Sequence, residues 1–390
     1  MKFKIKAAAV ISALVLSLSP VSQFRADAAQ LSVPDITQGY VSATEDEAVL
    51  QIRQFLKEHT EDFTVTVPDT GSSKEETSYG LMYNAFGETG SGSEGDYLRF
   101  SVRSFKCAIT KSSGNLNLRY TVTYSTTLEE EKALTAELDS LMDSRRFSSI
   151  HGDYNKIRSI YLYVTSSVSY ADDEKDPYAY TAYSALFNGT AVCQGVTQLL
   201  YRMYNDCGIP CRIIAGISHD NTGEKPDGHH VWLIVKLEGQ YYYLDPTWDM
   251  KFKGKSFYYF LKGTDDLDSA FPSLSHIATR EDQQTFPDYQ SEEFRSLYPV
   301  AQTAYPSPRY SYGDVNGDKI IDAIDSSLIL SEYARLSSGC VSSFTQNQAS
   351  YADIDRNGVV DAVDASIILS YYAKISNGAD IALSDLVKNH

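Results

Sequence analysis

Apolar residues recur along this chain with two different periods, and these periods predict where helices and strands lie. Helical spacing marks four segments: residues 46–59, 127–142, 153–173 and a run that starts at Cys193. Alternating apolar and polar positions predict strands in five segments: residues 96–109, 116–126, 211–218, 230–237 and 240–248. In the central part the helices precede the strands, which predicts an α+β fold with helices packed on an antiparallel sheet.

The first 28 residues have the pattern of a secretory signal peptide. Three lysines precede an apolar run of about a dozen residues, and Ala26-Asp27-Ala28 offers a cleavage site with small residues. The run is too short to span a bilayer, which takes about 20 residues. We therefore expect an exported, extracellular protein.

The rest of the chain divides by composition. Residues 87–96 are polar and rich in glycine, which predicts a flexible loop inside an N-terminal α+β module without evident chemistry. Residues 296–311 are punctuated by proline and predict a linker. The expected divisions are a signal peptide (1–28), the N-terminal module (29–145), a central domain (146–295), the linker (296–311), an all-α repeat (312–376) and a tail (377–390).

The chain is strongly acidic, with a formal charge of −17 that becomes −20 once residues 1–28 are removed. Such a charge argues against nucleic acid and anionic membranes as partners, and it suits calcium. Five cysteines leave at least one free thiol; Cys207 and Cys211 could form a bridge, although nothing in their order demands it. No second matched cysteine pair supports a zinc site.

Two acidic loops, 39 residues apart, begin the C-terminal repeat. Oxygen ligands at loop positions 1, 3, 5, 9 and 12, with a backbone carbonyl at position 7, are the pattern that binds Ca²⁺. The candidate ligands are Asp314, Asn316, Asp318, Ile320, Asp322 and Asp325, then Asp353, Asp355, Asn357, Val359, Asp361 and Asp364. A helix-like stretch follows each loop, so two calcium sites are a better interpretation than two acidic surface loops.

This repeat resembles a type I dockerin, the calcium-binding module of cellulosomal proteins. The resemblance implies binding to a cohesin module of a scaffold protein. The positions that set specificity in dockerins correspond to Ala323-Ile324 and Ala362-Val363. Lys319 departs from the pattern, because glycine is usual at loop position 6.

Cys193 begins a predicted helix, where the helix dipole favours the thiolate form of a cysteine. Such a nucleophile needs a base and a group that orients the base. If Glu238-Gly239 forms a two-residue hairpin turn, paired residue numbers total 477 and His230 lies diagonal to Asp245 on one face. The neighbouring His229 points to the other face and receives no catalytic role.

The segments around these residues resemble the transglutaminase-like superfamily, which has a papain-related cysteine fold. The resemblance covers residues 145–280 and includes "GTAVCQGVTQLL", "GHHVW", "YYYLDPTWD" and His276. It implies that Cys193 is the nucleophile, that His230 is the general base and acid, and that Asp245 orients the imidazole. Leu233 and the sequence "CQGVT" depart from the usual family motifs.

These residues predict thiol-mediated acyl transfer on amide bonds of proteins or peptides, through a thioester and without a cofactor for catalysis. Hydrolysis by a peptidase or amidase is favoured and transamidation comes next. The alternative from another class is a binding or scaffold module that has kept the fold without turnover. A glycosidase is least favoured, because no pair of carboxylates stands out as acid and nucleophile.

Overall fold

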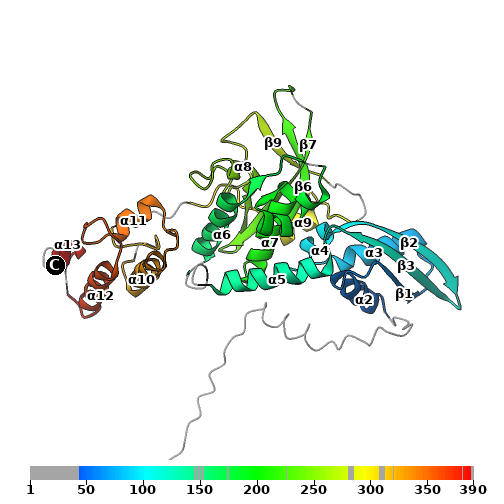
Figure 1. Cartoon of the computed structure of the whole chain (residues 1–390), viewed down its shortest axis with the longest axis horizontal. Coiled ribbons are helices and arrows are strands. Elements are labelled where there is room, and N and C mark those ends of the chain that lie inside the picture. The colour runs from blue at the N-terminus through cyan, green and yellow to red at the C-terminus, as the bar shows by residue number, and fades with distance from the viewer. Residues whose placement is uncertain are drawn as a thin grey trace, which may run out of the picture.

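The structure is a computed structural model that describes residues 44–144, 147, 150, 153–173, 175–224, 226–279, 285–306, 312–318, 320–379 and 381–387. The predicted signal peptide and Lys319 lie outside the described residues. Three hydrophobic cores follow one another along the chain. Figure 1 shows the N-terminal sheet and the C-terminal helices on opposite sides of the central domain.

The N-terminal part is a three-stranded antiparallel sheet covered by two helices. Its elements are α2 (Glu45–Lys57), β1 (Asp62–Pro68), α3 (Lys74–Ala85), β2 (Val102–Ser112) and β3 (Asn115–Tyr124). Phe63, Val65 and Val67 alternate with exposed residues along β1, so one face of the strand packs on the helices. The strand order is β1-β3-β2, which leaves β2 at an edge of the sheet.

The prediction of a strand at residues 96–109 is wrong for the first half of this segment. Residues Asp96–Ser101 form the short helix α4, and all six are buried. Tyr97 and Phe100 of α4 pack in the central core, so both faces of this segment are covered and its alternation does not produce a strand. Helix α5 (Leu128–Asp143) begins with a capping box between Thr127 and Glu130. It also packs in the central core through buried leucines.

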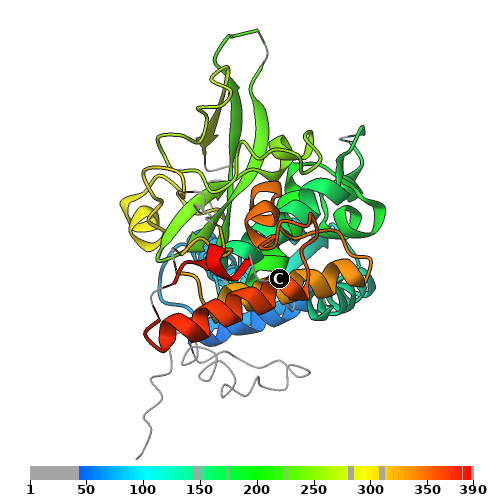
Figure 2. The same ribbon diagram turned by 90° about the vertical axis from the view of Figure 1, so that its left-hand side faces the viewer.

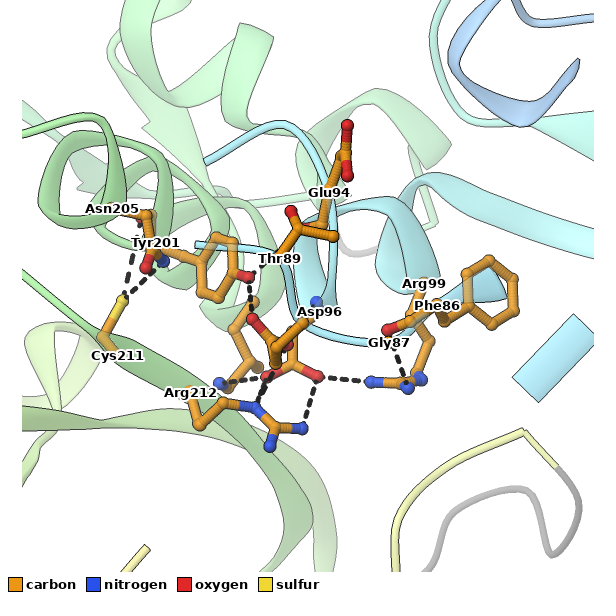
Figure 3. Close-up of polar contacts among 12 residues, drawn as sticks. Phe86, Gly87, Thr89, Glu94, Asp96, Arg99, Tyr201, Asn205, Cys211 and Arg212 are labelled. Carbon is orange, nitrogen blue, oxygen red and sulfur yellow. Dashed lines mark hydrogen bonds and ion pairs between the residues drawn. The ribbon is translucent and has the colours of Figure 1, made fainter. Parts of the chain in front are cut away.

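An ionic cluster joins α4 to the central domain. The Asp96 carboxylate accepts from Arg212 Nε at 2.7 Å and pairs with Arg99 next to it on α4 (Figure 3). Arg99 Nε also donates to the backbone oxygen of Thr285 at 2.8 Å. These charges are buried, hydrogen-bonded and of opposite sign, so loss of one partner would leave an uncompensated charge in the interior.

The glycine-rich segment 87–96 is packed against α7 (Cys193–Asp206) and is not the flexible loop expected. A Cβ on Gly95 would lie 2.5 Å from the Tyr201 hydroxyl, and a Cβ on Gly92 would lie 2.4 Å from the Asp206 carboxylate. The segment therefore uses glycine for close approach to α7, and also for positive φ at Gly95.

The central domain packs helices on a four-stranded antiparallel sheet of order β8-β7-β6-β9. The strands are β6 (Cys211–Asp220), β7 (Gly228–Leu237), β8 (Gln240–Leu244) and β9 (Leu274–Ala278), and the helices include α6 (Asp153–Ser167), α7 (Cys193–Asp206) and α9 (Glu292–Leu297). Short elements surround the start of α7: β4 (Ser169–Tyr170), η1 (Pro177–Tyr180), η2 (Ser184–Asn188) and β5 (Thr190–Ala191). The predicted α+β class is confirmed.

The predicted hairpin has the predicted register. Leu237 pairs with Gln240 and Leu233 with Leu244, so the paired numbers total 477. Glu238 and Gly239 both have positive φ, as a two-residue hairpin turn requires. Strand β8 ends earlier than predicted, however, because Asp245 caps the short helix α8 (Pro246–Met250).

The C-terminal part is entirely helical. Its helices are α10 (Ala323–Ser337), α11 (Gln346–Ala352), α12 (Ala362–Ser376) and α13 (Leu383–Val387). The two repeat helices α10 and α12 pack together (Figure 1 and Figure 2). Ser326 Oγ donates to the Ala365 oxygen at 2.9 Å. Arg158 of α6 donates to the Ser343 oxygen at 3.1 Å, which brings this part into contact with the central domain.

Candidate active site

The start of α7 is fixed by close backbone contacts around Cys193. The backbone N–H of Val192 donates to the Ala179 oxygen at 2.9 Å. A Cβ on Gly195 would lie 2.7 Å from the Thr181 oxygen, so only glycine lets this turn of α7 approach η1 so closely. The Cys193 side chain consequently sits at the beginning of the helix, as the sequence predicted, with about 9% of its surface exposed.

His230 and Asp245 meet as the hairpin register predicted. His230 Nε2 donates to Asp245 Oδ2 at 2.9 Å, and both side chains are buried. Because Nε2 is engaged by Asp245, Nδ1 is the nitrogen left for the Cys193 thiol, which contributes a hydrogen bond to His230. Thr197 Oγ1 donates to the Val231 oxygen at 3.2 Å and so fixes α7 against β7 beside the histidine.

His276 and Asp268 extend this set beyond the three predicted residues. His276 Nε2 donates to the same Asp245 oxygen at 3.1 Å, and His276 Nδ1 contacts Asp268 Oδ1 at 2.6 Å. With carboxylates at both ring nitrogens, His276 satisfies both contacts best as an imidazolium. The sequence offered His276 only as part of a family resemblance, and nothing local marked Asp268.

Strand β6 sets the spacing between the two histidine-bearing strands. Gly216 of β6 pairs with His230 of β7 on one side and with Ala278 of β9 on the other. A Cβ on Gly216 would lie 2.1 Å from the Ile277 oxygen, so β9 can approach only because this residue has no side chain. Trp248 stacks on the His230 ring with centroids 5.0 Å apart and shields the imidazole on that side.

The electrostatics of the site favour charged side chains. Burial opposes a charged imidazole, but Asp245 and the Cys193 thiol outweigh burial and raise the pKa of His230 to about 10. Burial also opposes the charge of Asp245, yet the two histidines hold the pKa of this carboxyl below its usual value. For His276, burial is outweighed by hydrogen bonds to Asp245 and Asp268, which raise its pKa.

A groove of about 1500 Å³ passes over Cys193 and His230. Its lining comes from both the central domain and the N-terminal part, including strand β2. His229 is exposed and lines the groove, whereas His230 is buried, so the two adjacent histidines face different surroundings. The arrangement gives a substrate access to the thiol while the imidazole is kept away from bulk water.

The C-terminal loops fold alike and gather their acidic residues. In the first loop the N–H groups of Val315 and Asn316 donate to Asp325 Oδ1; in the second the N–H groups of Ile354 and Asp355 donate to Asp364 Oδ1. Position 9 of each loop is an aspartate that caps the following helix: Asp322 before α10 and Asp361 before α12.

The donor set of the second loop fits calcium. Ligand atoms of Asp353, Asp355 and Asp364 lie within 4.8 Å of one another. Asp353 Oδ1 is buried and has no hydrogen-bond partner, which is the state expected of an oxygen that binds a cation. Among the described residues no lysine or arginine pairs with Asp325 or Asp364, although both are fully buried.

The predicted cohesin contacts lie at the start of α10 and α12. Ile324 and Val363 are both exposed apolar side chains, 39 residues apart in the repeat. Further exposed pairs with the same separation follow along the two helices: Leu330 with Leu369, and Tyr333 with Tyr372. The two repeats therefore present matching apolar faces.

The five cysteines are all free, so Cys207 and Cys211 are not bridged. Instead, Cys211 Sγ accepts from Asn205 Nδ2 at 3.2 Å. Within the described part of the chain, no helix is both long and apolar enough to cross a membrane.

Two family models match the chain. Residues 144–246 match the transglutaminase-like superfamily, and residues 312–371 match the dockerin type I domain. These matches confirm both resemblances seen in the sequence, and the first includes Cys193, His230 and Asp245. The chain therefore contains a transglutaminase-like core and a type I dockerin domain. Dockerins of this type generally bind calcium, and they imply a cohesin partner and a cellulosomal, typically extracellular setting.

Individual relatives match only in part. The human kyphoscoliosis peptidase is 30% identical over 119 residues, which are 28% of this chain and 18% of that protein's length. A candidate cysteine protease from Cytophaga hutchinsonii has a TM-score of 0.28 and 14% identity, over 47% of this chain and 72% of its own. A structure described as a TGase has a TM-score of 0.27 and 13% identity, over 53% of this chain and 59% of its own.

Proposed function

We propose that this transglutaminase-like protein is a secreted cysteine enzyme that attacks amide bonds of proteins or peptides and is tethered to a cellulosome by its dockerin. The observation that carries the proposal is the His230–Asp245 hydrogen bond of 2.9 Å, beside a thiol that lines the same groove. A buried, oriented imidazole next to a cysteine at a helix start is the arrangement that nucleophilic catalysis requires.

The proposed reaction begins when His230 Nδ1 takes the proton of the Cys193 thiol. The thiolate attacks the amide carbonyl carbon, and backbone N–H groups at the start of α7 would stabilise the oxyanion. The imidazolium then gives its proton to the leaving amine as the C–N bond breaks, which leaves a thioester. Asp245 keeps its charge throughout and stabilises the imidazolium; His276 holds the Asp245 carboxylate in place.

Hydrolysis of the thioester by water makes the enzyme a peptidase or amidase, and this is the outcome we favour. An extracellular enzyme works in bulk water, and the matching human protein is named a peptidase. Attack by a lysine amine would instead give a transamidase.

Mass spectrometry of peptide and protein mixtures incubated with the full chain tests this function. Wild type should produce cleaved, deamidated or crosslinked products that Cys193→Ala does not, and the mass change identifies which acceptor resolves the thioester. Products that persist in Cys193→Ala would contradict the proposal.

Labelling of the thiol by iodoacetamide separates an enzyme from an inactive binding module. Cys193 should react rapidly at pH 6–7, and His230→Ala should slow the reaction sharply. A rate equal to that of a free thiol, unaffected by His230→Ala, would favour the inactive module.

The dockerin part of the proposal rests on two calcium ions held by the loop aspartates, with Ile324 and Val363 among the cohesin contacts. Replacing both side chains by aspartate should weaken binding to a cohesin without changing the helix content. Unchanged binding would show that the cohesin contacts lie elsewhere.

A further inference from the structure

The groove over Cys193 has a charge opposite to that of the whole chain. The chain carries 51 acidic and 34 basic residues, so a groove lined at random would contain more carboxylates than cations. Among the described residues that line the groove, none is Asp or Glu. Five are basic: Arg99, Arg103, Lys175, Lys251 and Lys253.

Four of these five cations are available to a ligand. Arg99 is buried and paired with Asp96, so it contributes no free charge. The other four are exposed, and within the described residues none forms an ion pair with a carboxylate. Lys253 Nζ donates to Ser169 Oγ at 2.8 Å, and Lys251 Nζ lies 4.4 Å from the centre of the Phe271 ring.

These cations come from three separate parts of the chain. Arg103 lies on the edge strand β2, Lys175 precedes η1, and Lys251 and Lys253 follow α8. The N-terminal part therefore supplies one wall of the groove and the central domain supplies the others. The buried ions of Asp96, Arg99 and Arg212 hold α4, which runs directly into β2, against the central sheet (Figure 3).

The same wall offers a backbone edge. Among the described strands β2 pairs with β3 only, and Val102, Arg103, Ser104 and Phe105 line the groove. An edge strand presents unpaired N–H and C=O groups that an extended polypeptide can bind. The groove volume of about 1500 Å³ also exceeds the ~300–1,000 Å³ typical of a small-molecule site.

We propose that the substrate is an acidic polypeptide segment, in which aspartate or glutamate residues flank the amide that Cys193 attacks. Arg103 and Lys175 would bind these carboxylates and determine specificity, while the edge of β2 would bind the backbone. This inference rests on the proposed attack on polypeptide amides and adds the charge of the substrate. The unpaired backbone edge favours a polypeptide over an acidic polysaccharide.

Binding to the full chain carrying Cys193→Ala tests the inference independently of turnover. The probes are a fluorescent decapeptide rich in glutamate, its counterpart with glutamine at the same positions, and oligogalacturonate. The glutamate peptide should bind about tenfold more tightly at low salt, because two or three exposed ion pairs each contribute a modest amount. The difference should shrink as salt screens the charges.

The double change Arg103→Glu and Lys175→Glu, made in the same background, should abolish this preference or reverse it. Lys106→Glu is the matched control, because Lys106 is an exposed cation on the same strand and does not line the groove. Circular dichroism of each variant, and the rate of Cys193 labelling with the thiol restored, establish that the fold is intact.

Each outcome bears on one proposal. Equal binding of the two peptides, or a preference that survives the double change, overturns the acidic substrate. Binding of oligogalacturonate that depends on Arg103, with no such binding of the glutamate peptide, overturns the polypeptide. Selective binding without turnover by wild type supports this inference and contradicts the proposed enzyme, whereas turnover without charge preference does the reverse.

Discussion

Asp245 in the central domain and Asp325 in the first C-terminal loop are both completely buried, yet their surroundings differ in charge. Asp245 accepts hydrogen bonds from two imidazoles and from the N–H of Trp248. Asp325 accepts only backbone N–H groups among the contacts of the described residues. The His230–Asp245 centre therefore carries its own compensating cations, whereas we propose that the buried charge of Asp325 is compensated by a calcium ion from solution.

The two parts should therefore respond to different features of their environment. A site neutralised by its own side chains is preorganised without a ligand and is controlled by pH. A site neutralised by a bound ion is controlled by the concentration of that ion. The following four changes test this comparison, beginning with the largest expected effect.

Cys193→Ala should lower activity by about 10⁵-fold, because no other described group can form the thioester. The variant should fold and bind a cohesin like wild type, since the change removes a single sulfur atom from the central core and leaves the C-terminal part untouched. Product formation by mass spectrometry and cohesin binding by calorimetry measure the two parts. Loss of cohesin binding in this variant would show that the two regions are not independent.

Asp245→Asn should lower activity by about 10³-fold, because the imidazole loses the carboxylate that orients it and stabilises its charge. The pKa of His230 is raised from 6.5 to about 10, so its stabilising ion pair is complete below about pH 6.5 and lost as pH rises through 10. Asparagine removes the interaction that raises the pKa of His230 most. The alkaline limit of Cys193 labelling, which is the pH at which His230 loses its proton and the ion pair is lost, should therefore move to lower pH. An unchanged limit would contradict the assigned partner.

Removal of calcium by a chelator should weaken cohesin binding by at least about 100-fold and lower the helix content of the C-terminal part. The rate of Cys193 labelling should not change, because His230 and His276 supply the positive charges that contact Asp245. Circular dichroism and labelling of the same sample measure both. A helix signal indifferent to the chelator would contradict the calcium sites, and slower labelling would contradict the independence of the triad.

His276→Gln should lower kcat by about tenfold, since glutamine can still donate to Asp245 but leaves the carboxylate less precisely held. It also removes a positive charge 5.5 Å, between ring centroids, from His230. The alkaline limit of labelling should therefore stay or move upward, opposite to the shift in Asp245→Asn. A downward shift would mean that His276 acts through something other than its charge and its contact with Asp245.

The hairpin shows what the sequence could predict. The turn at Glu238-Gly239 and the strict alternation of a strand were enough to place His230 beside Asp245, because both rules act over short distances. The loop and helix order of the C-terminal repeat could also be predicted, since the residues of each acidic loop lie within twelve positions and a helix follows each loop.

Other features depend on distant contacts that no local pattern encodes. Asp96–Ser101 alternates like a strand, but its burial on all sides and the ion pairs of Asp96 make it a helix. Asp268 reaches the site because the loop before β9 folds back, which brings it to His276 eight residues later. The acidic composition likewise gave no sign of the basic groove, because its cations come from three separate segments of the chain.

Gly216 has a consequence for how this centre can vary. Gly216 lies between the strands that carry His230 and His276. The distance between the two imidazoles is therefore set by main-chain packing and is as rigid as the sheet itself. Residues along the groove can then change to accept new substrates, while the geometry of the proposed proton transfer stays the same. Any side chain at position 216 would instead push β9 away from β6 and so change the separation of His230 and His276, without contacting a reacting atom.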